Sequence, residues 1–286
     1  MAKISNFGVI GGDERQIAMA KSISNDGYNV YISGFEKYND ISSNNLDYTI
    51  LKSECIILPL PVTKDNITIN APFSDTNIIL NDGLAKKMKN KKVFCGMSSK
   101  LYKTSDVWKS VDIYDYYNRE DYAIKNAVPT AEGAIAIAMS EYSGTINGSR
   151  CLITGFGRIG KVLAGMLKGL GACVTVSARK QSDLAWIEIL GYNPIKTSNI
   201  YKTNGYDLIF NTIPYMIFDS HTLALSATDS IVIDLASLPG GVDFNAARRL
   251  GIKAIQALSL PGKVAPKTAG EITKKTIYNM LEEDGG

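Results

Sequence analysis

A glycine-rich run near the middle of the chain has the spacing of a dinucleotide-binding turn. It reads G-F-G-R-I-G, which matches the pattern G-x-G-x-x-G. In such a turn the first glycine permits a tight bend, the second lets the backbone approach a pyrophosphate, and the third lets a helix pack closely on a strand. Free N–H groups at the helix N-terminus then favour the phosphates. The predicted phosphate-binding residues are Gly155, Phe156, Gly157, Arg158, Ile159 and Gly160.

The elements expected around this turn strengthen the prediction. An apolar strand over residues 151–154 precedes the turn, a helix follows to about residue 170, and a second strand is expected over residues 173–176. This order of strand, turn, helix and strand is the context in which the glycine pattern is specific. The alternative interpretation is a glycine-rich turn of the same shape that binds no ligand.

The residues after the second strand indicate which dinucleotide binds. An acidic side chain at this place binds the ribose 2′-hydroxyl of NAD, but no acid occurs here before Asp183. A hydroxyl and two cations suit a 2′-phosphate, because arginine offers a fork of donors and lysine a point charge. We therefore predict NADP in preference to NAD, although an exposed polar loop is the alternative. The residues concerned are Ser177, Ala178, Arg179 and Lys180.

Loops at the carboxyl ends of parallel strands hold the ligand in doubly wound sheets. In the second half of the chain, we expect such loops to line the nicotinamide half of the cofactor with Asn211, Thr212, Ile213, Pro214, Leu235, Ala236 and Ser237. In the first half, the corresponding strand ends carry Ser98, Ser99 and Lys100. We expect the active site in the cleft between the two sets of loops.

Candidates for proton transfer are limited, because the chain contains one histidine, His221. We interpret it as a surface residue or a neighbour of a helix cap, which leaves histidine-based triads poorly supported. The candidate catalytic residues are Lys263, Glu132 and Arg15, and the candidate substrate-binding residues are Arg15, Ser98, Ser99, Lys100, Lys263 and Lys267. Alternatively, Glu132 only favours a helix start and the cations are solvated at the surface.

The 286 residues suffice for two domains, and short buried strands alternate with helices along both halves. We predict an α/β protein of two Rossmann-like, doubly wound domains. Residues 1–128, with 267–286 packing back on them, form a flavodoxin-like or Rossmann-like substrate domain, and residues 129–266 form the NADP-binding domain. Residues 11–16 are glycine-rich but carry acids and lack the dinucleotide spacing. Pro129 and Thr130 predict a helix start between the domains.

Composition excludes several other classes of protein. The net charge is only +3, and it is spread evenly, so we expect no nucleic-acid partner. The four cysteines lie in or beside apolar runs without metal-site spacing, which indicates reduced, buried thiols and no metal. We predict no membrane span or signal peptide, and a cytoplasmic location.

Several motifs together resemble the A-type subunits of dipicolinate synthases from endospore-forming bacteria. The most specific of them stand at the two ends of the chain, V-I-G-G-D-x-R-Q at residues 9–16 and L-P-G-K-V-A-P-K-T-A-G at residues 260–270. The others are P-T-A-E-G-A at 129–134, the glycine turn at 155–158, A-R-K at 178–180, F-N-T-I-P at 210–214, and I-D-L-A-S at 233–237 with P-G-G at 239–241. The similarity covers nearly the whole chain.

The resemblance implies an NAD(P)-dependent oxidoreductase that oxidises dihydrodipicolinate, or its hydrated precursor, to dipicolinate during sporulation. It also implies a partner, the B-type subunit of dipicolinate synthase, and a location in the mother cell. Wider similarity is to two-domain alanine and 2-hydroxyacid dehydrogenases, which often use a catalytic histidine that this sequence lacks. Two alternatives stay open: a non-catalytic NADP-binding partner of the B-type subunit, or another two-domain dehydrogenase acting on a small carboxylic acid. A homodimer is also possible.

Overall fold

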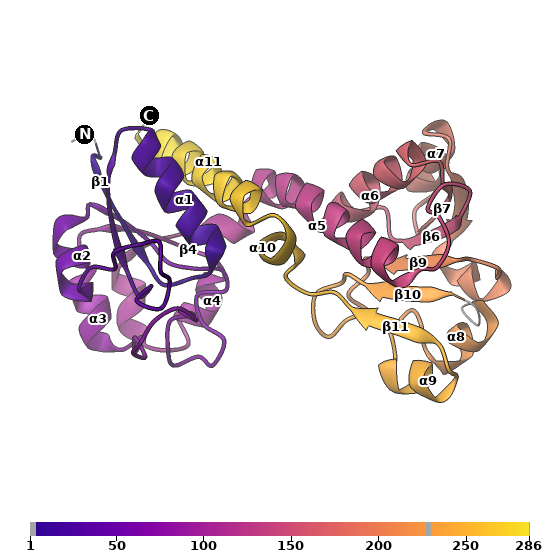
Figure 1. The fold of residues 1–286 in the computed structure, drawn as a ribbon, viewed down its shortest axis with the longest axis horizontal. Coiled ribbons are helices and arrows are strands. Elements are labelled where there is room, and N and C mark those ends of the chain that lie inside the picture. Colours follow the sequence, from indigo (N-terminus) through magenta and orange to yellow (C-terminus); the bar gives the residue numbers. More distant parts are fainter. Residues whose placement is uncertain (1–3, 227–229, 286) are drawn as a thin grey trace. The chain divides into compact units, whose positions relative to one another are not determined.

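The computed structural model describes residues 4–226 and 230–285, and the chain divides into two compact units (Figure 1). Unit 1 comprises the chain up to Lys125 together with the part from Ala265 onward, and unit 2 comprises Asn126–Val264. We expected the domain boundaries between residues 128 and 129 and between residues 266 and 267. Both units contain a parallel sheet with helices on its faces, so the predicted α/β class is confirmed.

Unit 1 is built on a five-stranded parallel sheet in the order β2-β1-β3-β4-β5. This is the flavodoxin-like order, in which the chain reverses direction across the sheet between β1 and β3. The strands are β1 (Asn6–Ile10), β2 (Asn29–Ser33), β3 (Cys55–Ile57), β4 (Lys92–Cys95) and β5 (Asp112–Asp115).

The helices of unit 1 cover both faces of this sheet because alternate strand residues point to opposite sides. Val9 and Ile57 belong to the core under α1 and α11, whereas Ile10 and Ile56 belong to the core under α2 and α3. The helices are α1 (Glu14–Asn25), α2 (Leu46–Lys52), α3 (Asp82–Lys87), α4 (Ser98–Leu101) and α11 (Pro266–Gly285), with 3-10 turns at Asp106–Ser110 and Tyr116–Asn118.

The C-terminal helix α11 packs along α1 within unit 1 (Figure 1). Ile272 and Ile277 of α11 enter the core of unit 1. Lys274, whose side chain is 7% exposed, binds Asp26 at 2.8 Å and Glu271 at 2.9 Å. Apolar burial and this ion pair therefore fix the end of the chain to its beginning.

Unit 2 is built on a six-stranded parallel sheet in the order β11-β10-β9-β6-β7-β8. Counted from β6, this is the strand order 3-2-1-4-5-6 of dinucleotide-binding folds, and its switch point lies between β6 and β9. The strands are β6 (Arg150–Thr154), β7 (Cys173–Ala178), β8 (Asn193–Lys196), β9 (Leu208–Asn211), β10 (Ile231–Asp234) and β11 (Lys253–Gln256).

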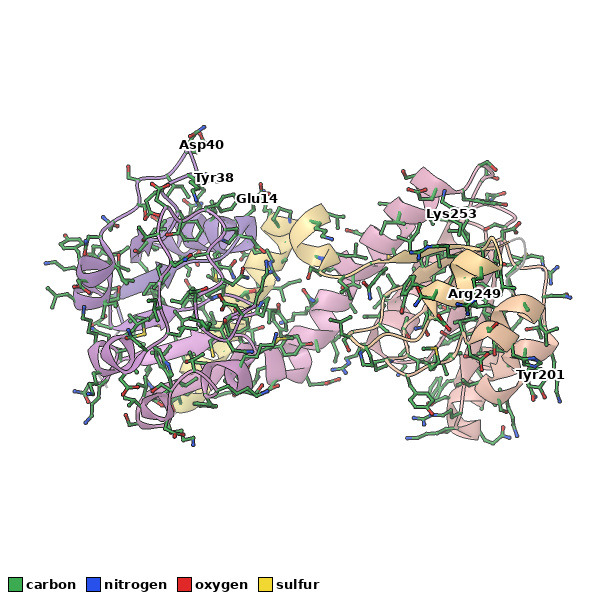
Figure 2. The ribbon with its side chains drawn as sticks, turned by 90° about the horizontal axis from the view of Figure 1, so that it is seen from below. Glu14, Tyr38, Asp40, Tyr201, Arg249 and Lys253 are labelled. Atoms are coloured by element: carbon green, nitrogen blue, oxygen red, sulfur yellow. The ribbon has the colours of Figure 1, made fainter. Side chains whose placement is uncertain are left out.

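The helices of unit 2 also lie on two faces. Ile153 and Phe210 pack toward the cluster that includes α6 and the helix α5 (Glu120–Glu141), and Leu152 and Ile209 pack toward α8 and α9. The helices are α6 (Arg158–Gly169), α7 (Gln181–Ile189), α8 (Ser220–Ser226), α9 (Phe244–Arg249) and α10 (Leu260–Val264), with a 3-10 turn at Thr197–Lys202. His221 is exposed on α8, and its ring lies 5.8 Å from that of Tyr201, a surface residue (Figure 2).

The expectation that a helix starts at Pro129 was wrong. One helix, α5 (Glu120–Glu141), runs through this proline, and the unit boundary falls inside it. Proline lacks the N–H that would bond to the Lys125 carbonyl oxygen, yet the helix continues through this position. The acidic first turn at Glu120 and Asp121 is the actual start.

The expectation of buried thiols was wrong for one cysteine, because Cys173, at the start of β7, is exposed. Cys55, Cys95 and Cys151 are buried. The candidate residue Lys263 lies in the short helix α10.

Candidate functional site

The glycine turn of unit 2 lies at the switch point, where β6 ends. The Gly155 N–H donates to the Ser177 carbonyl oxygen at 3.0 Å, so the turn lies directly beside the end of β7. Gly155 has a φ of +96°, a backbone conformation that side chains disfavour. A Cβ there would also lie 2.6 Å from the Thr212 hydroxyl. Glycine at this position is therefore required by the fold itself.

Gly157 and Gly160 differ in what surrounds them. A Cβ on Gly160 would lie 2.1 Å from the Gly155 carbonyl oxygen, so this glycine allows α6 to pack against the end of β6. A Cβ on Gly157 would meet no heavy atom within 4 Å, and the φ of Gly157 is −83°. Nothing in the fold demands glycine at Gly157. The open space in front of it is what a pyrophosphate close to the backbone needs.

The helix that follows is shaped to bind an anion at its N-terminus. Gly157 is the N-cap of α6 and no side chain caps the helix. Leu163, Ala164 and Leu167 on its inner face are buried and fix its direction. The first turn therefore presents backbone N–H groups and the positive end of the dipole at the switch point.

The end of β7 presents two cations next to this turn. Arg179 and Lys180 are exposed, and Ala178 is buried. Ser177 is fully buried, and its hydroxyl accepts a hydrogen bond from the Thr197 hydroxyl at 3.3 Å. Arg179 and Lys180 are thus exposed at the end of β7, whereas the Ser177 side chain bonds within the unit.

A buried polar network joins the carboxyl ends of three neighbouring strands. Asn211, at the end of β9, accepts from the Thr154 hydroxyl at 2.6 Å and donates to Asp234 at 2.7 Å. Asp234, at the end of β10, also accepts from the N–H groups of Ala236 at 3.2 Å and Gly241 at 3.0 Å. Asn211 and Asp234 are both 0% exposed. The network fixes the loops that leave β9 and β10.

Sequence reasoning predicted Asn211 as a direct cofactor contact and overlooked this network. The signal was present, because Thr154, Asn211 and Asp234 are the polar last residues of three apolar strands. Parallel strands end at the same edge of a sheet, so such residues meet. Of the remaining residues predicted here, Pro214 and Ser237 are exposed, Thr212 and Ile213 are half-buried, and Leu235 and Ala236 are buried.

In unit 1, the residues Ser98, Ser99 and Lys100, which we predicted to bind the substrate, directly follow the turn after β4. Met97 adopts a left-handed conformation with a φ of +67°, which is strained for a residue other than glycine. Asp115 holds this turn by accepting from the N–H groups of Met97 at 3.2 Å and Ser98 at 2.7 Å. Among the described residues, no side chain bonds to the hydroxyls of Ser98 and Ser99 or to the Lys100 ammonium.

Arg15 has a different environment from the one expected. Its guanidinium forms two 2.8 Å contacts with Asp13 and donates to the Leu60 carbonyl oxygen at 2.6 Å. Burial lowers the pKa of Arg15, but the hydrogen bond and charge of Asp13 outweigh burial, and the pKa is raised overall. The side chain is 10% exposed and ties the loop after β1 to the loop after β3. It is not a free cation for a substrate carboxylate.

The other predicted catalytic residues, Glu132 and Lys263, and the predicted substrate-binding residue Lys267 are accessible. Glu132 is exposed in the interior of α5, and Lys263 and Lys267 are exposed in α10 and α11. Within the described part of the chain, none of the three has a hydrogen-bonding or ionic partner. Glu132 does not lie in a first helical turn, so the alternative role of favouring a helix start does not apply.

Two further features bear on the kind of site present. In residues 4–226 and 230–285, no group of three or more histidine, cysteine and acidic side chains is arranged to hold a metal ion. No helix in the same ranges combines the length and the apolar character needed to cross a membrane.

Comparison with known proteins identifies the family. Residues 6–117 match the family of N-terminal domains of the A-type dipicolinate synthase subunits. The A-type dipicolinate synthase subunit from Bacillus subtilis (strain 168) is 33% identical over 282 residues, which is 96% of this chain and 95% of that protein. The chain belongs to the family of A-type dipicolinate synthase subunits. The resemblance noted in the sequence is thereby confirmed.

Solved structures agree with this assignment. The crystal structure of the A-type dipicolinate synthase subunit from Bacillus halodurans matches with a TM-score of 0.86 and 32% identity, covering 97% of each chain. A transhydrogenase from Sinorhizobium meliloti matches with a TM-score of 0.68 and 14% identity, covering 96% of this chain and 93% of that one. At such low identity, the second match shows a shared fold alone, and it confirms the two-unit Rossmann-like architecture.

Proposed function

We propose that this chain is an oxidoreductase component whose unit 2 binds NADP. The observation that carries the proposal is the Gly155–Gly160 turn at the switch point, with open space at Gly157 and an uncapped helix N-terminus behind it. When bound, the nicotinamide ring of NADP accepts a hydride from the substrate. The backbone N–H groups of the turn would bind the pyrophosphate.

The preference for NADP over NAD is supported by the end of β7. Arg179 and Lys180 are exposed beside the turn, and no acid follows before Asp183, so a ribose 2′-phosphate would meet only positive charge. The Asn211 and Asp234 side chains are already hydrogen-bonded within the protein. Their role would therefore be to position the loops that line the nicotinamide half of the cofactor. Thr212, Ile213 and Ser237 remain the candidates for contact in these loops.

We propose that the substrate is dihydrodipicolinate, or its hydrated precursor, and that the product is dipicolinate, as the family name implies. Oxidation of dihydrodipicolinate removes a hydride and a proton and makes the ring aromatic, so it needs hydride positioning and only a modest base. The hydrated precursor would also have to lose one water molecule. Ser98, Ser99 and Lys100 would bind a substrate carboxylate through two hydroxyls and an ammonium. Lys263 and Glu132 are the candidates to take the proton, and Lys267 is a further candidate carboxylate ligand.

The family name describes one component of a synthase, which supports a second component, the B-type subunit, as partner. A non-catalytic role, in which this chain binds NADP and the B-type subunit oxidises the substrate, remains the second candidate. This role is favoured because, in the described ranges, no group of this chain bonds to the side chains of Glu132, Lys263 or Lys267, whereas a catalytic base normally gains its activity from neighbouring groups.

A binding and turnover experiment tests these proposals together. The dissociation constants of NADP and NAD are measured for the wild type and for Arg179→Ala. We expect the wild type to prefer NADP, and Arg179→Ala to lose about tenfold or more in NADP affinity with little change for NAD. Tighter binding of NAD by the wild type would contradict the cofactor assignment.

Turnover of dihydrodipicolinate with NADP is then followed with and without the B-type subunit. Lys100→Met and Lys263→Met are compared with the wild type. We expect Lys100→Met to raise KM and Lys263→Met to lower kcat. Unchanged kcat/KM removes the residue from the site, and turnover that requires the B-type subunit and is unaffected by both substitutions favours the non-catalytic role.

A further inference from the structure

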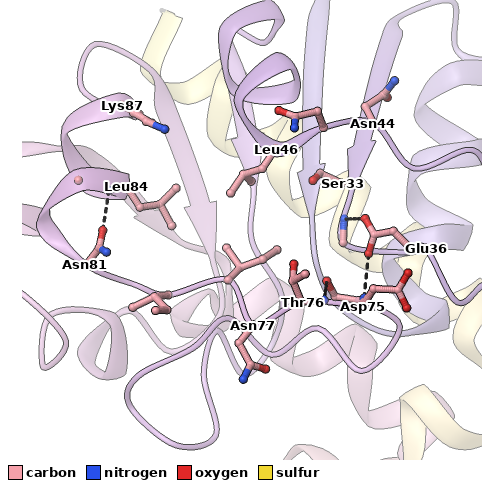
Figure 3. Close-up of a pocket in the computed structure, with 16 residues that line it drawn as sticks. Ser33, Glu36, Asn44, Leu46, Asp75, Thr76, Asn77, Asn81, Leu84 and Lys87 are labelled. Atoms are coloured by element: carbon pink, nitrogen blue, oxygen red, sulfur yellow. Dashed lines mark hydrogen bonds between the residues drawn. The ribbon is translucent and has the colours of Figure 1, made fainter.

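A cavity of about 660 Å³ lies in unit 1 at the carboxyl end of β2 (Figure 3). Its size falls within the range of about 300–1,000 Å³ that small-molecule sites occupy. Ser33 closes it on one side, and Leu46, Ile78 and Leu84 supply apolar walls. The residues proposed above to bind NADP belong to unit 2, and none of them lines this cavity.

The position of the cavity matches the adenosine end of a dinucleotide-binding unit. In unit 1, the Gly11 N–H donates to the Ser33 carbonyl oxygen at 2.9 Å, and Ile10 pairs with Ser33. In unit 2, the Gly155 N–H donates to the Ser177 carbonyl oxygen at 3.0 Å, and the strand pairing is the same. Ser33 is therefore the topological counterpart of Ser177, after which the adenosine ribose lies in this fold.

The two serines differ in their hydroxyl groups. The Ser177 hydroxyl is bonded to Thr197 inside unit 2. Ser33 is only 3% exposed, yet its hydroxyl has no hydrogen-bond partner among the described residues and lines the cavity. The Ser33 hydroxyl opens onto the cavity, so it is available to bond to a ligand there in place of water.

Two asparagines add donors at the rim of the cavity. The Asn45 side-chain oxygen accepts from the Asp47 N–H at 2.9 Å and caps α2. The Asn81 side-chain oxygen accepts from the Leu84 N–H at 3.0 Å and caps α3 (Figure 3). These bonds fix the orientation of both amides, and their NH₂ groups have no acceptor in the described part of the chain. The cavity therefore offers donors to an acceptor-rich ligand.

The charges of unit 1 disfavour a phosphate group on that ligand. The Asp13 carboxylate caps α1, the helix after the glycine turn, and Gln16 completes the cap at 3.0 Å. An anion there would meet a carboxylate in place of free N–H groups. Glu36 and Asp75 also line the cavity, and the Lys87 ammonium is paired with Asp47 at 2.6 Å.

We propose that this cavity binds an uncharged nucleoside of the adenosine type. The apolar walls would pack on the base, the NH₂ groups of Asn45 and Asn81 would donate to ring nitrogens, and the Ser33 hydroxyl would bond to the ribose. Unit 1 is then a second nucleoside-binding unit that has kept the base end and lost the phosphate end.

Calorimetric titration of the full chain with adenosine and with AMP tests the proposal, and saturating NADP is present to fill unit 2. Asn45→Asp and Asn81→Asp are the critical variants, because aspartate caps a helix as well as asparagine but donates no hydrogen bond. Asn245→Asp, in the exposed first turn of α9, is the matched control. We expect the wild type and the control to bind adenosine, and each critical variant to bind about tenfold more weakly.

Melting temperatures check that the variants fold, and they should match that of the wild type. Adenosine affinity unchanged by both substitutions, or no saturable binding up to about 10 mM, overturns the proposal. Tighter binding of AMP than of adenosine overturns the exclusion of phosphate. Resonances of the asparagine NH₂ groups, followed by NMR, should shift with adenosine even if NADP does not bind to unit 2, which separates this proposal from the proposed function.

Discussion

At the scale of single residues, the three positions of the turn differ in the physical reason for which glycine occupies them. Gly155 needs its positive φ, Gly160 leaves no room for a Cβ, and Gly157 has neither constraint. The sequence pattern treats them alike. The structure therefore separates a glycine that the fold requires from one that only a ligand would require.

This separation gives a prediction. Gly157→Ala should lower the free energy of unfolding by only about 0.5–1 kcal/mol, because alanine fits this backbone but is a poorer N-cap than glycine, while NADP binding weakens about tenfold or more. Gly160→Ala should cost about 2 kcal/mol of stability, because the methyl group forces α6 away from β6. Urea unfolding and cofactor titration measure the two effects. Gly169→Ala, whose Cβ meets nothing within 4 Å, is the control.

At the scale of elements, the docking of α11 on α1 depends on a half-buried ion pair within unit 1. Hydrogen bonds and the charge of Lys274 lower the pKa of Asp26. Burial raises the pKa of Glu271, but a hydrogen bond from Ser22 and the interaction with Lys274 outweigh burial, so that this pKa is also lowered. The pKa of Lys274 is raised by the same pairing despite burial. Carboxylates with lowered pKa values stabilise the fold above their ordinary pKa and lose that effect as the pH falls.

We therefore expect Lys274→Met to cost about 1–2 kcal/mol near neutral pH, since its two partners are partly exposed. The wild type should lose this contribution as the pH falls below about 4.5, the ordinary pKa of Glu271. Unfolding by urea between pH 3 and 7, about the range of carboxyl titration, measures the effect. Lys275→Met, on an exposed neighbour, is the control, and an equal loss for both lysines would contradict the role of the ion pair.

At the scale of the whole molecule, two parallel sheets of different strand order share one chain. Unit 1 has the flavodoxin-like order and a capped first helix, and unit 2 has the dinucleotide order and an uncapped one. A ligand stabilises the folded part that binds it. The proposed location of NADP therefore predicts which strands a bound cofactor protects.

At about 100 times its dissociation constant, NADP should stabilise unit 2 by about 2.7 kcal/mol. Hydrogen exchange of the amides in β6 and β9 should slow by up to about 100-fold, with β1 and β3 unchanged. Mass spectrometry of peptides from both units measures this. Equal protection of both units would show that they unfold together, and protection confined to unit 1 would contradict the assignment of NADP to unit 2.

The sequence by itself determined the class of fold and the position of the dinucleotide turn, because both depend on local patterns. Apolar strands alternate with helices, and the glycine spacing encodes a backbone shape that few other residues permit. The terminal motifs at residues 9–16 and 260–270 also indicated the family. These features need no knowledge of distant contacts.

The tertiary structure decided which polar side chains are free and which are already used. Arg15 and Asn211 look like ligand contacts in the sequence, but Asp13 and Asp234 bind them. Pro129 looks like a helix start, but the helix begins at the acidic turn of Glu120 and Asp121 and runs through the proline. For Arg15 and Asn211 the outcome depends on where a hydrogen-bond partner lies in space, and a linear pattern of residue types does not contain that information.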